Sequence, residues 1–172
     1  GCGGKILVDI PMEPEQVSGL REVLGGAGAE CTLETRDDTY GGIKMIERFA
    51  HLFPKKPGQM NSEAERWRKT MEFGMTIRPI EEYHGEPVYK IVFIAPNAVC
   101  LAETRRLYED QFVFCESRLG DTPSAIVNGE LINRKFDKGT GIRAICDHLG
   151  RSLDDTIGFG DSDDDLQMTD VV

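Results

Sequence analysis

The order of apolar and polar positions predicts strands and helices in mixed order over most of the chain. Runs of β-branched and aromatic residues predict strands, whereas apolar positions three and four residues apart predict helices. Val17, Leu20 and Leu24 have the helical spacing, and Pro14 suits the first turn of that helix. We expect strands at residues 5–10, 30–35, 86–96 and 111–117, and helices at 14–24, 61–73 and 97–110.

The C-terminal part follows a different pattern. Residues 124–132 predict either one strand or a tight hairpin around Asn128–Gly129, the dipeptide favoured in two-residue turns. A helix is expected at 139–149, because its apolar positions form one stripe and Gly150 follows them. The segment "TIGFG", residues 156–160, then predicts a short buried strand.

This order of elements predicts an α/β protein with two parts. The first part lacks the steady alternation of strand and helix that a parallel sheet requires, which indicates an antiparallel α+β layer. The second part is similar to one βαβ unit. We therefore expect a domain boundary near residues 122–126, with domains at 1–124 and 125–172.

Composition and charge exclude several classes of protein. Among 172 residues, 40% are hydrophobic and 29% are charged, which is typical of a soluble globular chain. The apolar runs are too short to span a bilayer and no secretory signal is visible, so we expect a cytoplasmic location and no membrane partner. The net charge of −10 argues against nucleic acid as a partner, because binding phosphates requires clustered Lys and Arg. The five cysteines contain no Cys-x-x-Cys pair and are expected to be reduced core residues.

A cluster of aspartates directly follows the apolar segment 156–160. Its members are Asp161, Asp163, Asp164 and Asp165. Two unit charges about 5 Å apart repel by roughly 3 kcal/mol at an effective dielectric constant of 20, so carboxylates that converge need a cation. Ligands of open α/β sheets bind at the carboxyl ends of strands, and Mg²⁺ is the usual hard cation beside a phosphate. The cluster therefore predicts a metal site.

Two other interpretations apply to the same aspartates. Asp163 and Asp164 would stabilise the N-terminus of a following helix, although this leaves Asp161 unexplained. We keep helix capping beside metal binding. An EF-hand calcium loop has the spacing of Asp161, Asp163 and Asp165, but Leu166 stands where the loop needs glycine, and Val172 stands where it needs glutamate. The calcium loop is therefore rejected.

Lys138 immediately precedes a glycine-rich helix start in "FDKGTGI". Its ammonium group could reach a bound phosphate or the carboxylates, and the first N–H groups of a helix favour the same anion. A solvent-exposed lysine in a loop is the alternative. The aspartate cluster further along the chain favours the functional interpretation.

The stretches "KGTGIRAICDHLG" and "DDTIGFGDSDDDLQM" together resemble the haloacid dehalogenase superfamily of phosphatases, most closely its Cof-type branch. That branch carries Lys-Gly at a helix start, a helix that ends in Leu-Gly, and a strand that ends in Gly-Asp-Ser-x-Asn-Asp-x-x-Met. The preceding residues are similar to its cap domain. The resemblance implies a cap domain at 1–124, with an antiparallel sheet and helices, and an incomplete Rossmann-like core at 125–172.

The resemblance also implies roles for single residues. Asp161 would bind Mg²⁺, Lys138 would neutralise the nucleophile and the transferring phosphoryl group, and Asp165 would support the metal site through water or hydrogen bonds. Asp164 would lie with Lys138 at the phosphate-binding position. The family usually has asparagine there and a carboxylate repels phosphate, so either Asp164 points away or the substrate pocket is altered.

The implied activity is Mg²⁺-dependent hydrolysis of small phosphorylated metabolites through an aspartyl-phosphate. The family's nucleophile motif, Asp-x-Asp-Gly-Thr, does not occur in this chain, so we expect an internal segment of a longer enzyme that is inactive alone. The strand 156–160 would then lack the neighbour that bears the nucleophile, and its apolar side chains would be open. A phosphomutase of the same superfamily and a non-catalytic binding module are the alternatives. Neither the substrate nor the oligomeric state is predicted.

In the cap, four residues are candidates to face a substrate: Arg36, Asp37, Tyr40 and Arg78. We expect them to be ordinary surface or turn residues.

Overall fold

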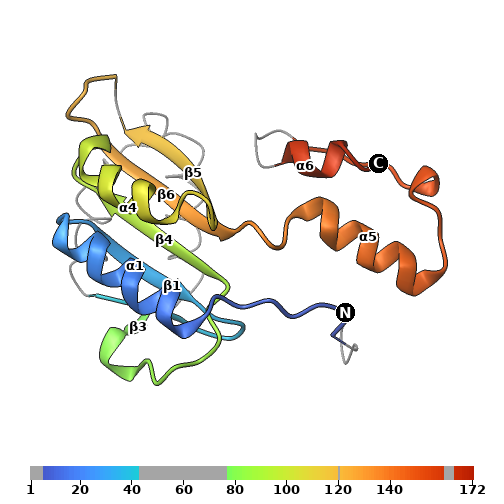
Figure 1. Ribbon diagram of the computed structural model, residues 1–172, viewed down its shortest axis with the longest axis horizontal. Coiled ribbons are helices and arrows are strands. Elements are labelled where there is room, and N and C mark those ends of the chain that lie inside the picture. The colour runs from blue at the N-terminus through green and yellow to red at the C-terminus, as the bar shows by residue number, and fades with distance from the viewer. Residues whose placement is uncertain (1–5, 43–76, 120, 161–164) are drawn as a thin grey trace, which may run out of the picture.

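The computed structural model describes residues 6–42, 77–119, 121–160 and 165–172. These residues form a six-stranded sheet that is followed by a helical C-terminal segment (Figure 1). Within these ranges, no helix has the length and apolar character needed to cross a membrane. The α/β class predicted from the sequence is confirmed.

The sheet is almost entirely antiparallel. Its strands are β1 (Glu30–Glu34), β2 (Thr39–Gly41), β3 (Ile77–Pro79), β4 (Lys90–Ala95), β5 (Phe112–Leu119) and β6 (Ile126–Asn133), in the spatial order β3-β2-β1-β4-β6-β5. Only β2 and β3 are parallel. The pairing aligns one apolar row across five strands, formed by Tyr40, Leu33, Ile91, Leu131 and Phe114. Cross-strand apolar contacts of this kind stabilise one face of the sheet.

Two helices cover one face of the sheet, α1 (Pro14–Gly26) and α4 (Ala102–Tyr108) (Figure 1). Short 3₁₀ turns lie before β4 and α4, at η1 (Ile80–Glu82) and η2 (Ala98–Leu101). After β6 the chain forms α5 (Lys138–Leu149), η3 (Leu153–Asp155) and α6 (Leu166–Thr169). Helices α5 and α6 pack together, apart from the sheet in the view of Figure 1.

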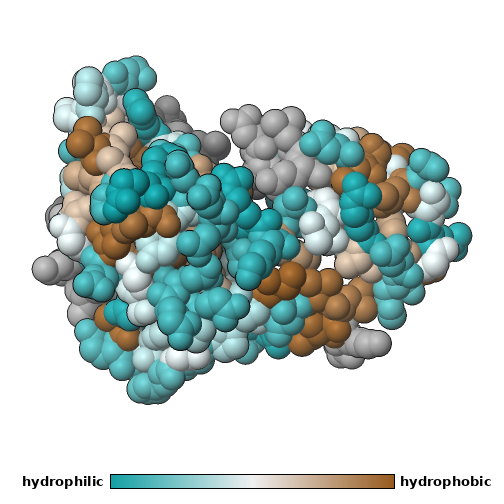
Figure 2. All heavy atoms as spheres, in the orientation of Figure 1, coloured by the Kyte–Doolittle hydropathy of each residue, from teal (hydrophilic) through white to brown (hydrophobic). Residues whose placement is uncertain are grey.

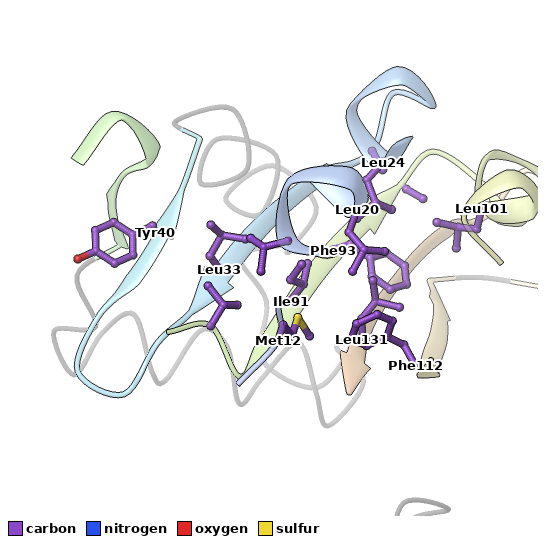
Figure 3. Close-up of a cluster of buried hydrophobic side chains, with 14 of the residues drawn as sticks. Met12, Leu20, Leu24, Leu33, Tyr40, Ile91, Phe93, Leu101, Phe112 and Leu131 are labelled. Atoms are coloured by element: carbon purple, nitrogen blue, oxygen red, sulfur yellow. The ribbon is translucent and has the colours of Figure 1, made fainter. Parts of the chain in front are cut away.

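The hydrophobic core lies between the helices and this face of the sheet (Figure 3). The helical layer supplies Leu20, Leu24 and Leu101, all fully buried. The strands supply Leu33, Ile91, Phe93, Phe112 and Leu131, which are also fully buried. Each such side chain contributes about 1.5–3 kcal/mol relative to an exposed one, so this layer stabilises the sheet unit.

Most of the predicted elements are confirmed. The helix at 14–24 and the strands at 30–35 and 111–117 correspond to α1, β1 and β5, and the strand within 86–96 begins at Lys90 as β4. The helix at 97–110 is split into η2 and α4, with Asn97 as the cap of η2. The helix at 139–149 is α5, which ends before Gly150. The predicted helix at 61–73 lies outside the described residues.

The predicted strand at 5–10 is wrong for residues 6–10, which form no strand. Ile6, Leu7 and Val8 are 53%, 39% and 37% exposed. Further along, Met12 N donates a hydrogen bond of 2.7 Å to Val88 O, in the segment just before β4. Apolar composition favours a strand, but a strand also needs a neighbouring ladder of hydrogen bonds, and residues 6–10 have none.

The predicted buried strand at 156–160 is also wrong. Its residues have no regular structure, and Ile157 and Phe159 are 82% and 87% exposed. This exposure agrees with the expectation that the apolar side chains of the segment are open. Figure 2 shows apolar surface over the N-terminal segment and the C-terminal elements.

The hairpin alternative for residues 124–132 is wrong, because β6 runs straight through Asn128 and Gly129. Gly129 lies opposite Phe93 on one side and Glu116 on the other. A Cβ atom at this position would lie 2.6 Å from the Cys115 carbonyl oxygen and 2.7 Å from Phe93 Cζ. The glycine therefore serves close packing within the sheet and not a turn.

Strand β6 pairs with both β4 and β5, so residues 126–133 belong to the sheet. We propose that the two parts of the chain divide after Asn133, in the connection 134–137, and not at residues 124–125. The domain boundary itself stays a prediction.

Replacing Gly129 by alanine is expected to destabilise the sheet. The new methyl group must displace the Phe93 ring or the β5 backbone, and overpacking of this kind costs about 1–3 kcal/mol. Urea unfolding followed by circular dichroism measures the change. Gly25→Ala is the matched control, because nothing lies within 4 Å of its Cβ position and alanine favours the helix by about 0.5–1 kcal/mol. Equal stability of the Gly129→Ala variant and the wild type would contradict this packing.

Candidate active site

Lys138 and Asp165 meet in the C-terminal segment, although they are 27 residues apart in the sequence. Lys138 is the first residue of α5, and Asp165 immediately precedes α6. The Lys138 ammonium group donates a hydrogen bond to Asp165 Oδ1 and forms an ion pair with it. The lysine side chain is 47% exposed, whereas the aspartate side chain is 14% exposed. The positive charge therefore stays accessible while its carboxylate partner is mostly buried.

Asp137 caps the N-terminus of α5. Its Oδ1 accepts hydrogen bonds from the Thr140 backbone N–H at 2.6 Å and from the Thr140 hydroxyl at 2.8 Å. The backbone hydrogen bond from Thr140 is the main cause that lowers the pKa of the Asp137 carboxyl below its ordinary value. The helix thus begins at Lys138, one residue earlier than predicted, with the lysine in its first turn.

Sequence reasoning missed Asp137. The signal was present in "DKGT", since an aspartate three residues before a threonine N–H at a helix start is a typical N-cap. The cap explains why a segment with two glycines forms the first turn of a helix.

Gly160 makes room for Asp165. A Cβ atom at position 160 would lie 2.7 Å from Asp165 Cγ and 2.8 Å from Asp165 Oδ2. The backbone of the apolar segment therefore touches the carboxylate that holds Lys138. Only glycine permits this approach without displacing the side chain.

The other predicted residues of the cluster, Asp161, Asp163 and Asp164, lie outside the described residues. The metal-ligand role of Asp161 and the phosphate-binding position of Asp164 stay predictions. Over the described ranges, no group of three or more His, Cys, Asp or Glu side chains could hold a metal ion.

A cavity of about 220 Å³ borders the start of α5. It is lined by Val113, Cys115, Ile132, Asn133, Arg134, Phe136 and Asp137. Its polar members already have partners: Asp137 accepts from Thr140, and Asn133 Oδ1 accepts from the Lys135 N–H at 2.9 Å. The cavity therefore offers mainly the apolar side chains of Val113, Ile132 and Phe136.

Arg36 belongs to a surface cluster that ties the N-terminal segment to the sheet. Its Nη2 lies 3.1 Å from both Asp9 Oδ2 and Tyr89 Oη, and Tyr89 donates a hydrogen bond of 2.6 Å to Asp9 Oδ1. The hydrogen bond from Tyr89, followed by the charge of Arg36, lowers the pKa of the Asp9 carboxyl. The cluster holds the segment before α1 in place.

The three remaining candidates in the sheet unit differ in their surroundings. Arg78 pairs with Asp38 at 3.1 Å and with Glu82 at 2.8 Å. Tyr40 is 1% exposed and belongs to the core. Asp37 is an exposed residue in a bend. The expectation that Arg78 and Asp37 are surface or turn residues agrees with these positions, whereas Tyr40 is a core residue.

Comparison with known proteins identifies the class of this chain. Residues 2–172 match the model of the haloacid dehalogenase-like hydrolase family, so the chain belongs to that family. No curated protein matches the sequence.

Solved structures share the fold. A hypothetical protein from Geobacillus kaustophilus is 18% identical with a TM-score of 0.65, and the match covers 98% of this chain and 57% of that one. A haloacid dehalogenase-like hydrolase from Bacillus subtilis is 19% identical with a TM-score of 0.65, covering 94% and 59%. A sugar phosphatase of subclass IIB is 16% identical with a TM-score of 0.63, covering 96% and 55%. The chain thus spans less than two thirds of the length of these proteins.

Gly160→Ala is expected to separate Asp165 from Lys138, because the added methyl group occupies the space of the carboxylate. The ¹⁵Nζ and ¹³Cε chemical shifts of Lys138 should change, and a crystal structure of the variant should lack the Lys138–Asp165 hydrogen bond. Gly26→Ala, whose Cβ position has nothing within 4 Å, should leave the Lys138 signals unchanged. An intact hydrogen bond in Gly160→Ala would show that position 160 does not constrain the pair.

Proposed function

We propose that the chain is part of a Mg²⁺-dependent phosphatase that hydrolyses small phosphate monoesters through an aspartyl-phosphate. The observation that supports this most directly is the Lys138–Asp165 pair at the start of α5. An accessible ammonium group, held by a mostly buried carboxylate that lies against Gly160, is suited to face a phosphoryl group. Membership of the hydrolase family is consistent with this chemistry.

Lys138 would act by charge. Phosphoryl transfer depends mainly on positioning and on neutralising the charge of the phosphoryl oxygens. The ammonium group of Lys138 would supply a positive charge, and Asp165 would keep it in place. The backbone N–H groups at the N-terminus of α5 favour an anion at the same end of the helix.

Mg²⁺ would be held by Asp161. The carboxylates gathered after Gly160 are hard oxygen donors, which Mg²⁺ prefers, and Asp165 is already oriented toward this end of α5. Asp165 would support the site through hydrogen bonds or water. When bound, the ion would polarise the phosphoryl oxygens and offset their charge. Asp164 would lie at the phosphate position, either pointing away or within an altered pocket.

The nucleophilic aspartate would come from a longer parent protein. The matched structures are longer than this chain, which spans 57% of the Geobacillus protein. The exposed apolar side chains at 156–160 are the surface that such an additional part would cover. The similarity in fold to a sugar phosphatase supports small phosphorylated metabolites as the substrate class. Transfer of the phosphate to another position of the substrate would identify a phosphomutase instead.

In the parent protein, Lys138→Ala and Asp161→Ala should each lower kcat/KM for a sugar phosphate by at least about a hundredfold. The first variant removes the positive charge of Lys138, and the second removes the carboxylate that would hold Mg²⁺, so each loses positive charge that would stabilise the transition state. Release of inorganic phosphate measures the rate. Lys135→Ala is the matched control, since this exposed lysine precedes Lys138 in the same connection. The chain without its parent should show no turnover. Full activity of both variants would refute the proposed roles.

Binding of Mg²⁺ gives a readout that does not depend on activity. Calorimetry of the chain with Mg²⁺ should show binding that Asp161→Ala abolishes and that Asp154→Ala, an exposed aspartate of η3, retains. In the parent protein, chelation should abolish phosphate release and added Mg²⁺ should restore it. Binding of equal strength to the wild type and to Asp161→Ala would place the metal elsewhere.

A further inference from the structure

Two adjacent residues of opposite charge stand at the start of α5, and each has a defined partner. Asp137 accepts two hydrogen bonds from Thr140, at 2.6 Å and 2.8 Å, while the Lys138 ammonium group reaches Asp165. One carboxylate therefore fixes the backbone of the first turn, and the other fixes the tip of the lysine side chain. The position of the ammonium group therefore depends on the backbone of Lys138 and on the contact at the tip of its side chain.

The cap sets the backbone of Lys138. Asp137 is extended, with φ of −126° and ψ of 177°, and its carbonyl accepts the first helical hydrogen bond, from Gly141 N at 3.0 Å. Its side chain meanwhile satisfies an N–H group that otherwise has no partner within the helix. Lys138 lies between Asp137 and Thr140, and the turn that these two residues form sets the direction of its side chain.

The connection that carries the N-cap residue Asp137 is anchored to the residues around β5 and β6. Arg134 donates from its backbone N–H to Gln111 O at 3.0 Å and from Nε to Glu109 O at 2.8 Å. Asn133, which is 7% exposed, accepts from the Lys135 N–H through Oδ1 at 2.9 Å and from the Phe136 N–H through its carbonyl at 3.2 Å. The connection between β6 and α5 is therefore a hydrogen-bonded turn and not a loose linker.

The ring of Phe136 completes this connection. A Cβ atom at Gly141 would lie 3.3 Å from Phe136 Cζ, so the ring lies against the first turn of α5. The turn is thus fixed by Asp137 through hydrogen bonds and by Phe136 through packing, and Lys138 follows both residues directly in the sequence.

We propose that Asp137 is a positioning residue for phosphoryl transfer, which sets the direction of Lys138 by capping α5. The inference rests on the proposed role of Lys138 and adds a residue that acts through it. Without the cap, the first turn of α5 loses its defined start, and the ammonium group no longer has one fixed position. Asp137→Ala removes the cap and also the negative charge next to Lys138, so the variants must separate capping from charge.

The test uses three substitutions in the parent protein, with kcat and KM for a sugar phosphate as the readout. Asp137→Ala removes the cap and should lower kcat by about tenfold or more while KM changes by less than about twofold, because Lys138 acts mainly in the transition state. Asp137→Asn keeps a cap of similar strength without the charge and should retain kcat within about threefold. Thr140→Val removes only the hydroxyl partner and should fall between them. Ser152→Ala, which removes the cap of η3, is the control and should match the wild type.

Amide hydrogen exchange and the Lys138 ¹⁵Nζ signal give a second readout on the chain itself. Asp137→Ala should speed exchange at Thr140 and Gly141 and shift the Lys138 signal, whereas Asp137→Asn should change neither. If Asp137→Ala does not fold, Thr140→Val and Asp137→Asn still provide the comparison.

The outcomes separate this inference from the proposed function. A fully active Lys138→Ala variant overturns the role of the lysine. An inactive Lys138→Ala variant beside a fully active Asp137→Ala variant overturns only the positioning role. Equal losses in Asp137→Asn and Asp137→Ala also overturn it, because they show that the charge and not the cap is required.

Discussion

The ion pair between the Lys138 ammonium group and the Asp165 carboxylate is the interaction on which the C-terminal segment depends. It joins the start of α5 to the residue before α6, while Gly160 leaves the space that the carboxylate needs. Because the aspartate is mostly buried, loss of the lysine would leave a carboxylate with little solvation, which is costly. The pair therefore supports the local structure and also presents a positive charge to solvent. In the proposed function, that charge would neutralise the oxygens of a phosphoryl group.

The sheet fixes the position of the turn that leads into α5. Strand β6 lies between β4 and β5, and its chain continues into α5 through the hydrogen-bonded turn at 134–137. Gly129 allows β6 to pass close to the Phe93 ring and the β5 backbone. A helical layer and a row of apolar side chains stabilise the same strands, so the position of the turn follows from the packing of the sheet.

Two apolar segments lie exposed on the surface. These segments, Ile6–Val8 and 156–160, belong to no sheet. Exposed apolar side chains in such number are typical of surfaces that another part of a protein covers. The chain also covers 57% of a matched structure of the same fold. The exposed segments are therefore consistent with the proposal that a further part of a longer protein covers this surface and completes the active site.

Local patterns predicted α1, β1, β5 and α5, because helical spacing, caps and apolar runs act over a few residues. The spacing of "KGTG" and "GFGDSDDD" also predicted the family. Other features depend on partners that are distant along the sequence. Asn128–Gly129 has the composition of a turn, but neighbouring strands hold it within β6, and residues 6–10 have the composition of a strand without a partner. The contact of Lys138 with Asp165 likewise requires the folded chain, since only packing of α6 against α5 brings together two side chains 27 residues apart.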